Sequence, residues 1–124
     1  MIERRGVRLE KDSNKYRAKK TVIDGYTFDS RKEAARYKEL KCLLKSGIIQ
    51  NLEIHKTFHL LPKQTDSKGR VLERKCDYIA DFAYTQDGEM VVEDVKSPAT
   101  RKKPEYVLKR KMMLFFHGIK IRET

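Results

Sequence analysis

The chain has 124 residues, of which 29 are Lys or Arg and 18 are Asp or Glu, so its formal net charge is +11 and its pI is about 9.7. This length favours one domain with a real core, and the charge favours a polyanionic partner such as nucleic acid. No long apolar run or signal-peptide pattern is present, which argues against a membrane or exported protein and predicts a cytoplasmic one without a membrane partner.

The first part of the chain predicts a basic arm, a hairpin and a helix. Residues 1–14 lack a periodic apolar pattern and are expected to be a basic N-terminal arm, followed by a single domain over residues 15–124. Two β-prone segments from Tyr16 to Phe28 flank Asp24-Gly25, a dipeptide preferred in tight hairpin turns. A helix is predicted from about Arg31 to Ser46, with Ser30 as its N-cap and Gly47 as its end.

The rest of the chain predicts four strands and a second helix. The stretch "IIQNLEIHKTFHLLP" indicates a strand ended by Pro62, and "QTDSKGR" is turn chemistry before a strand from about Val71 to Tyr84. After a turn over residues 85–88, the strand "VVEDVKSP" returns. "SPATRKKP" connects it to a helix from Pro104 to His117, and "IKIRE" is a last strand. The order predicts an α/β protein with helices covering a sheet.

Two carboxylates are expected to face each other in the hairpin around "TQDGE". If the turn is centred on Asp87-Gly88, paired residue numbers sum to 175 and Asp81 faces Asp94, where like charges repel. Lys96 lies on the same face as Asp94 and would offset the repulsion, and a divalent cation such as Mg²⁺ would do more. A different loop length would instead place Asp81 opposite another residue, and an ordinary ion pair on a solvated face is the alternative interpretation.

Glu33 has two possible roles in the first predicted helix. The segment from Ser30 to Glu33 has the S-x-x-E spacing of a capping box. Glu33 also continues the apolar stripe of Tyr37, Leu40 and Leu44, so it is expected to point inward, towards the carboxylate pair. A third converging carboxylate is easier to explain by metal-dependent phosphodiester chemistry than by structure alone.

These motifs resemble a known nuclease superfamily. "ADF" at 80–82 followed by "DVK" at 94–96 resembles the D…(D/E)-x-K signature of the restriction-endonuclease-like, or PD-(D/E)XK, nucleases, with Ala80 in place of the motif's proline. Together, "VIDGYTFDSRKEAARYKEL", "YIADFAY" and "VVEDVKS" are similar to a phage and prophage family of small domains, formerly of unknown function, placed in that superfamily. The likeness implies an α-β-β-β-α-β core with a central mixed sheet, Mg²⁺ or Mn²⁺ dependence and DNA cleavage, with small four-way-junction resolvases as the analogy.

The expected mechanism gives each group one role. Asp81 and Asp94, with the Val95 carbonyl, would hold the metal, while Lys96 would orient or deprotonate the attacking water. Glu33 would bind the metal through water or help to place a second ion. Glu93 points to the other face of the sheet in this register and is expected to be structural, paired with a basic side chain.

Clusters of basic residues are expected to bind the phosphate backbone without reading sequence. These residues are Lys15, Arg17, Lys19, Lys20, Arg31, Lys32, Arg101, Lys102 and Lys103.

The last predicted helix bears on oligomeric state. Leu108, Met112 and Phe115 follow helical spacing and are expected in the core, while Met113, Leu114 and Phe116 either fill the core or form a dimer surface. Symmetric cleavage of a junction needs two sites, so a homodimer preferring branched DNA is predicted. A non-catalytic DNA-binding protein on the same fold is the main alternative, and a basic RNA-binding domain is another.

Overall fold

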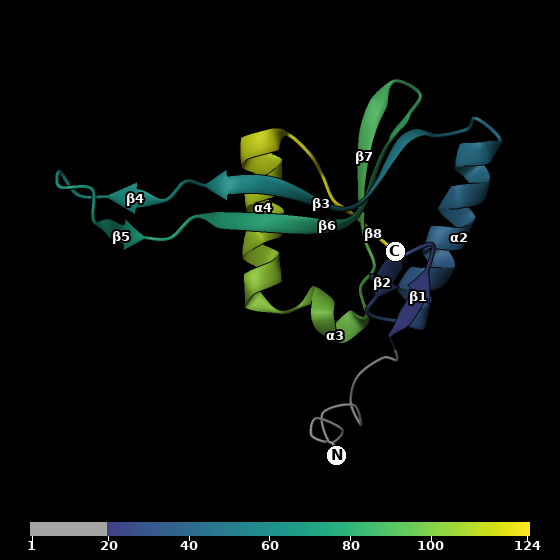
Figure 1. Ribbon diagram of the computed structural model, residues 1–124, viewed down its shortest axis with the longest axis horizontal. Helices are drawn as coiled ribbons and strands as arrows, with labels where there is room; N and C mark the ends of the chain where they lie inside the picture. The colour runs from purple at the N-terminus through teal and green to yellow at the C-terminus, as the bar shows by residue number, and fades with distance from the viewer. Residues whose placement is uncertain (1–19) are drawn as a thin grey trace, which may run out of the picture. The chain divides into compact units, whose positions relative to one another are not determined.

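The protein is described by a computed structural model, which covers residues 20–124 (Figure 1). The chain divides into two compact units between Cys42 and Leu43. The predicted N-terminal arm, residues 1–14, and three of the predicted DNA-binding residues, Lys15, Arg17 and Lys19, lie outside the described part of the chain.

A short hairpin begins the described part of the first unit. Strand β1 (Thr21–Ile23) pairs antiparallel with β2 (Tyr26–Phe28). The turn residues Asp24 and Gly25 have φ values of 53° and 83°, the left-handed conformation that this type of two-residue turn requires. The predicted turn is therefore confirmed.

Helix α2 (Arg31–Lys45) comes next in the chain, and it ends within one residue of the predicted end at Ser46. The Glu33 N–H donates to Ser30 Oγ at 3.0 Å, which satisfies one of the free donors of the first turn. Gly47 has a φ of 82°, the left-handed conformation in which glycine commonly terminates a helix. Both predicted ends of the helix are confirmed.

One face of α2 is buried. Its buried residues are Glu33, Ala34, Tyr37 and Leu40. Within the first unit, the Tyr37 ring packs 5.0 Å from that of Phe28, and the Tyr37 hydroxyl donates to Asp24 Oδ2 at 2.7 Å. The prediction that Glu33 continues an inward-facing stripe is confirmed.

A four-stranded mixed sheet forms the centre of the second unit. The strands lie in the order β3 (Gln50–Leu61), β6 (Cys76–Gln86), β7 (Glu89–Asp94) and β8 (Arg122–Glu123). The β3–β6 and β6–β7 pairs are antiparallel, and β8 pairs parallel with β7. The predicted α/β class with a central mixed sheet is confirmed.

The register of the β6–β7 hairpin is the one that the sequence predicts. Phe82 pairs with Glu93 and Ala83 with Val92, and the turn residues Asp87 and Gly88 have φ values of 52° and 80°. A two-residue turn fixes the register locally, so the alternative registers are excluded.

The predicted strand over residues 71–84 is wrong in one respect, because the structure divides it. Strands β4 (Gln64–Thr65) and β5 (Val71–Glu73) form a separate two-stranded sheet, and the main sheet resumes only at Cys76. Pro62 has no N–H to donate to a ladder, so β3 pairing ends at Leu61 and the chain continues as a projecting hairpin (Figure 1).

The connection after β7 contains a helix that the sequence did not predict. Helix α3 (Pro98–Arg101) begins at Ser97, whose hydroxyl accepts from the Thr100 N–H at 3.3 Å while Thr100 Oγ1 accepts from the Ser97 N–H at 2.9 Å. Helix α4 (Pro104–His117) follows and ends at Gly118, with a φ of 68°, as predicted.

The core of the second unit lies between the sheet and α4. It combines Phe58, Leu60, Tyr78, Ala80, Ala83, Val92, Tyr106, Met113 and Ile121. The predicted core stripe of α4 is confirmed at Met112, which is partly buried against the core, but it is wrong at Leu108 and Phe115, which are 57% and 82% exposed. The buried residues of this helix are Tyr106 and Met113. Apolar residues occur all round this helix, so their spacing does not select one face.

Candidate functional site

Asp81 and Asp94 come from neighbouring strands and lie at the end of the β6–β7 ladder. Phe82 pairs with Glu93, so the next step of the same register brings Asp81 beside Asp94. Asp81 is half-buried, and its Oδ2 accepts a hydrogen bond from the Val95 N–H at 2.7 Å. Asp94 is buried, with 3% of its surface exposed. Two carboxylates are therefore held together where strand β7 ends.

The Asp94 carboxylate is oriented by one donor on each oxygen. The Tyr78 hydroxyl donates to Oδ2, and Lys96 Nζ lies 3.2 Å from Oδ1. Burial, and next the charge of Asp94, raise the pKa of Tyr78 well above its usual range, so its hydroxyl stays protonated and remains a donor. A buried carboxylate needs such partners, since an unpaired charge in the interior is very costly.

Lys96 lies between a carboxylate and an aromatic ring. Its Nζ is 4.4 Å from the centroid of the Tyr106 ring, within the range of a cation–π contact. The Tyr106 hydroxyl donates to Glu123 Oε2 at 2.6 Å, and burial followed by this hydrogen bond raises the pKa of Tyr106. The sequence did not indicate that Tyr78 and Tyr106 would surround the predicted pair.

Strand β8 fixes the backbone on which these groups stand. The Lys96 N–H donates to the Thr124 carbonyl at 3.1 Å, and the Thr124 N–H donates to the Asp94 carbonyl at 3.0 Å. The parallel pairing places Asp94 opposite Glu123. The last strand therefore holds the D-x-K segment beyond the end of the β6–β7 hairpin.

Glu93 is a structural residue on the other side of the strand, as predicted. It is fully buried, accepts a hydrogen bond from the Tyr84 hydroxyl, and lies 3.9 Å from Arg122 Nη1. The predicted basic partner of Glu93 is Arg122. Adjacent residues of β7 thus carry two buried carboxylates, each bonded to a different tyrosine.

His55 is a neighbour of Asp81 that the sequence interpretation missed. Ile54 pairs with Phe82 and Lys56 with Ala80, so His55 lies opposite Asp81, with a ring nitrogen within 4.8 Å of a carboxylate oxygen. His55 has a φ of 55°, which is rare for a non-glycine residue inside a strand and clusters at functional sites. The sequence placed His55 in a predicted strand, but only the register between β3 and β6 shows that it lies opposite Asp81.

Glu33 belongs to the first unit, where its local role is visible. Its carboxylate accepts from the Asp29 N–H at 3.1 Å, while its own N–H donates to Ser30, so the predicted capping arrangement is present in modified form. Glu33 is also buried, with 4% exposed. Whether it acts with Asp81 and Asp94 stays a prediction from the sequence.

The described members of the predicted phosphate-binding set are exposed, but two have acidic neighbours. Lys20 lies 3.9 Å from Asp29, and Arg101 lies 3.8 Å from Glu123. Both ion pairs are loose and therefore weak. The other exposed members are Arg31, Lys32, Lys102 and Lys103.

The side chains of the second unit suit a divalent cation. Carboxylate oxygens are the ligands that Mg²⁺ prefers, and the imidazole of His55 extends the donor set towards first-row transition ions. Asp81 and His55 could hold such an ion together. Each carboxylate oxygen has a second lone pair, so Asp94 could join them while it keeps its contacts with Tyr78 and Lys96.

The fold and this site define a small, basic α/β protein with a group of side chains that suits a metal ion. Residues 13–122 match the family described as proteins of unknown function, DUF1064, so the chain belongs to that family. Comparisons with curated proteins and with solved structures gave no significant match. In residues 20–124, no helix is both long and apolar enough to cross a membrane.

Proposed function

We propose that the protein is a metal-dependent endodeoxyribonuclease of the PD-(D/E)XK type, acting in the cytoplasm of a bacterial host. The observation that carries the proposal is the grouping of Asp81, Asp94 and Lys96 where the pairing of β6 with β7 ends. A pair of acids and an ammonium group in this arrangement supply the metal ligands and the cation that phosphodiester hydrolysis requires.

Asp81 and Asp94, with the Val95 carbonyl, are the proposed ligands of Mg²⁺ or Mn²⁺, which when bound would polarise the scissile phosphate and acidify a water molecule. His55 is a further ligand candidate beside Asp81. An imidazole in the set favours Mn²⁺ over Mg²⁺. Glu33 is the predicted contributor from the first unit.

Lys96 has the electrostatic role in this mechanism. Its ammonium is held by Asp94 Oδ1 and by the Tyr106 ring, so it stays beside the carboxylates. From there it can hydrogen-bond the attacking water and offset the negative charge that develops on the phosphate. Tyr78 keeps the Asp94 carboxylate in one orientation throughout.

The DNA would be bound by exposed cations, and the protein would act as a homodimer on branched DNA, as junction resolvases do. The exposed Arg31, Lys32, Lys102 and Lys103 supply phosphate contacts. Helix α4 supplies a dimer surface, since Leu108, Leu114, Phe115 and Phe116 are between 48% and 82% exposed. Exposed apolar groups of this size are usual at protein interfaces.

One observation favours the alternative of a non-catalytic DNA-binding protein. Both Asp94 oxygens already have protein partners, Tyr78 and Lys96, which is how a purely structural acid would be satisfied. The two functions differ in one measurable property, which is metal-dependent strand cleavage.

The test is a cleavage assay on four-way-junction, flap, duplex and single-stranded DNA with Mg²⁺, Mn²⁺ or chelator. Wild-type protein should cut only with metal. Asp81→Asn, Asp94→Asn and Lys96→Ala should each slow cleavage by more than about 100-fold while DNA binding persists. Asp87→Asn is the matched control, because Asp87 lies in the exposed turn of the same hairpin and Asn also adopts its left-handed conformation.

Two outcomes would contradict the proposal. Cleavage that continues in chelator would show that the reaction needs no metal. A wild-type rate in one of the three variants would show that this residue is not part of the site. DNA binding without cleavage under any metal would establish the accessory protein instead.

A further inference from the structure

The β4–β5 hairpin is an arm, residues 62–75, that projects from the ends of β3 and β6 (Figure 1). Every residue in it is exposed except Asp66, which is half-buried. Val71 and Leu72 are 54% and 63% exposed, so the arm has no core of its own. A two-stranded ribbon without a core is marginally stable in water, and a binding partner would stabilise it.

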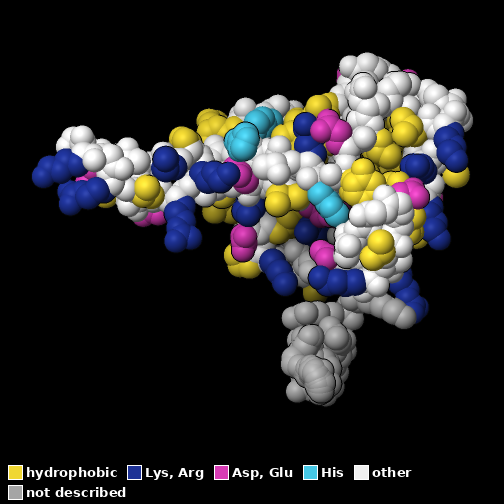
Figure 2. Space-filling view, viewed as in Figure 1, with side chains coloured by type: hydrophobic (Ala, Val, Ile, Leu, Met, Phe, Trp, Pro, Cys, Tyr) yellow, Lys and Arg dark blue, Asp and Glu magenta, His cyan; other side chains and the backbone are white. Residues whose placement is uncertain are grey.

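The arm is strongly cationic. It contains five basic residues, Lys63, Lys68, Arg70, Arg74 and Lys75, against two acidic residues, Asp66 and Glu73, which gives a net charge of +3. Figure 2 shows Lys and Arg side chains gathered along it and at its tip. Among the described residues, no ion pair involves Lys63, Lys68 or Arg74. These three charges are therefore available to an anionic partner.

The tip of the arm is preorganised. Asp66 Oδ1 accepts from the N–H groups of Lys68 and Arg70, each at 2.9 Å, and Gly69 adopts the left-handed conformation with a φ of 83°. Hydrogen bonds, first that from the Arg70 backbone, lower the pKa of Asp66, so this cap persists at neutral pH. The Arg70 side chain belongs to the same cap, because its Nε lies 2.7 Å from Asp66 Oδ2. A fixed turn lowers the entropy cost of binding through Lys68.

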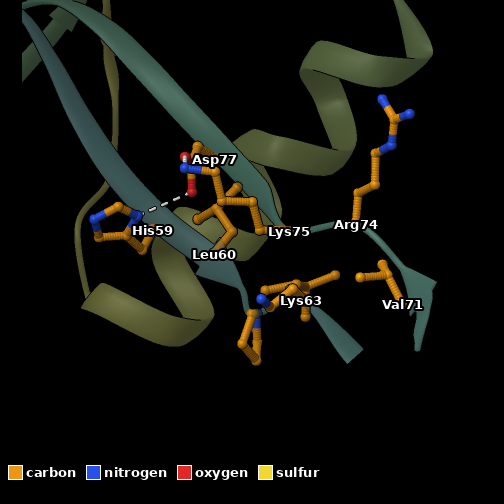
Figure 3. Close-up of a pocket in the computed structure, with 9 residues that line it drawn as sticks. His59, Leu60, Lys63, Val71, Arg74, Lys75 and Asp77 are labelled. Carbon is orange, nitrogen blue, oxygen red and sulfur yellow. Dashed lines mark hydrogen bonds and ion pairs between the residues drawn. The ribbon is translucent and has the colours of Figure 1, made fainter. Parts of the chain in front are cut away.

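A cleft of about 960 Å³ lies at the base of the arm (Figure 3). Leu61, Pro62 and Val71 contribute apolar surface to it, and Lys63, Arg74 and Lys75 contribute charge. Lys63 and Arg74 come from the two opposite chain segments of the arm's base. The cleft is lined by none of the predicted catalytic residues, so it is separate from the predicted catalytic site.

We propose that this arm enters the major groove of duplex DNA, with Lys68 in the groove and Lys63 and Arg74 on the flanking phosphates. The major groove is about 12 Å wide and about 8.5 Å deep and accepts a two-stranded ribbon. From Pro62 to Asp66 the arm reaches about 13 Å at roughly 3.3 Å per residue, which exceeds the depth of the groove. The exposed Leu72 suits the apolar methyl groups of thymine that line it.

This inference rests on the proposed action on DNA, but its test does not require cleavage. Binding is measured in chelator by fluorescence anisotropy, using one duplex and one single strand of equal length over a range of salt concentrations. The arm variant combines Lys63→Gln, Lys68→Gln and Arg74→Gln. The control variant combines Lys38→Gln, Lys45→Gln and Lys111→Gln, which removes the same charge from exposed positions outside the arm.

The arm variant should bind duplex more weakly than wild type does. Its log–log salt slope should become shallower by about 0.9 for each phosphate that the arm no longer neutralises, while the control stays near wild type. A duplex carrying bulky groups in its major groove should bind wild type and arm variant equally, whereas a minor-groove ligand should not compete. The arm variant and the control variant should bind single-stranded DNA with similar affinity.

Each contrary result has a separate meaning. An arm variant with wild-type duplex affinity and slope overturns the inference, even if the protein cuts DNA. An equal loss of affinity for single strands overturns groove insertion, and a change from dimer to monomer in the arm variant assigns the arm to a second copy of the chain. Arm-dependent binding without any cleavage keeps this inference and refutes the nuclease.

Discussion

Two buried tyrosine–carboxylate pairs in β6 and β7 provide a matched test of the site at the scale of single residues. Tyr78 bonds Asp94, and Tyr84 bonds Glu93. Tyr78→Phe and Tyr84→Phe should each lower the free energy of unfolding by about 1–3 kcal/mol, because each leaves a buried acceptor without its donor. Only Tyr78→Phe should also slow cleavage, by about 10- to 100-fold, since partners of metal ligands have effects of that size.

Urea unfolding and single-turnover cleavage of the two variants would measure these effects. Equal loss of cleavage in both, at equal stability, would mean that Asp94 has no role distinct from that of Glu93.

Glu33 can be separated into its two possible roles by one substitution. Glu33→Gln keeps an oxygen to accept from the Asp29 N–H, so the melting temperature should change little, while the negative charge is lost. Cleavage should fall by about 10-fold or more if the carboxylate serves the metal. Glu39→Gln is the control, because Glu39 lies on the exposed side of α2 and pairs only weakly with Arg36. Full activity of Glu33→Gln would leave only the helix cap.

The candidate residues differ in how far the sequence could predict them. Asp81 and Asp94 were predictable because a two-residue turn at Asp87-Gly88 fixes their register locally. His55 was not, because its place opposite Asp81 depends on pairing between β3 and β6, which are separated by the whole arm and include register shifts in β3. Non-local pairing with irregular register has no periodic signal in the sequence.

At the scale of elements, Glu123 links β8 to α4. From its contacts we expect the stability of the protein to depend on pH. Its carboxylate accepts from Tyr106 and lies 3.4 Å from Arg110 Nη1. The Tyr106 hydrogen bond is the main cause that lowers the pKa of Glu123 below its ordinary 4.5. Because the pKa of Glu123 is lower in the folded state than in the unfolded state, its carboxylate contributes fully to the free energy of unfolding above about pH 4.5. This contribution is lost as the pH falls further.

Glu123→Gln should therefore lower the free energy of unfolding by about 1–2 kcal/mol at neutral pH, and the difference from wild type should shrink in acid. Urea titrations at several pH values would measure it, with the exposed Glu89→Gln as the control. A difference that is constant across the acid range would show that the charge of Glu123 does not matter.

The elements that the sequence failed to predict have local physical explanations. The arm arises where Pro62 interrupts the β3 ladder, and turn residues alone do not reveal how far a hairpin projects. Helix α3 has the Ser97–Thr100 capping pair, but its four residues are too few to give an apolar period. The buried face of α4 was ambiguous because apolar residues surround that helix, and tertiary packing of Met113 selected the face.

At the scale of the whole molecule, the net charge of +11 means that DNA binding and self-association should depend on salt in opposite ways. DNA binding should weaken as salt rises, because condensed counterions are no longer released as favourably. Self-association of like-charged chains should strengthen, because salt screens their mutual repulsion. Light scattering and DNA-binding titrations over one salt series would therefore distinguish the proposed homodimer from aggregation on DNA.

The exposed face of α4 supplies the last prediction. Phe115 is 82% exposed and stacks edge-to-face on Phe116 at 5.1 Å, so a symmetric contact between two α4 helices would bury both rings from each copy. Phe115→Ser should weaken dimerisation by about 100- to 10,000-fold, since burial of one Phe is worth about 1.5–3 kcal/mol and a two-fold interface loses it twice. Val22→Ser, at another exposed apolar position in β1, should leave the dimer intact. The monomeric variant should still nick duplex DNA but should no longer cut a four-way junction symmetrically, because each site cuts one strand. A monomeric wild type, or a Phe115→Ser protein that remains dimeric by light scattering at micromolar concentration, would remove α4 from the assembly.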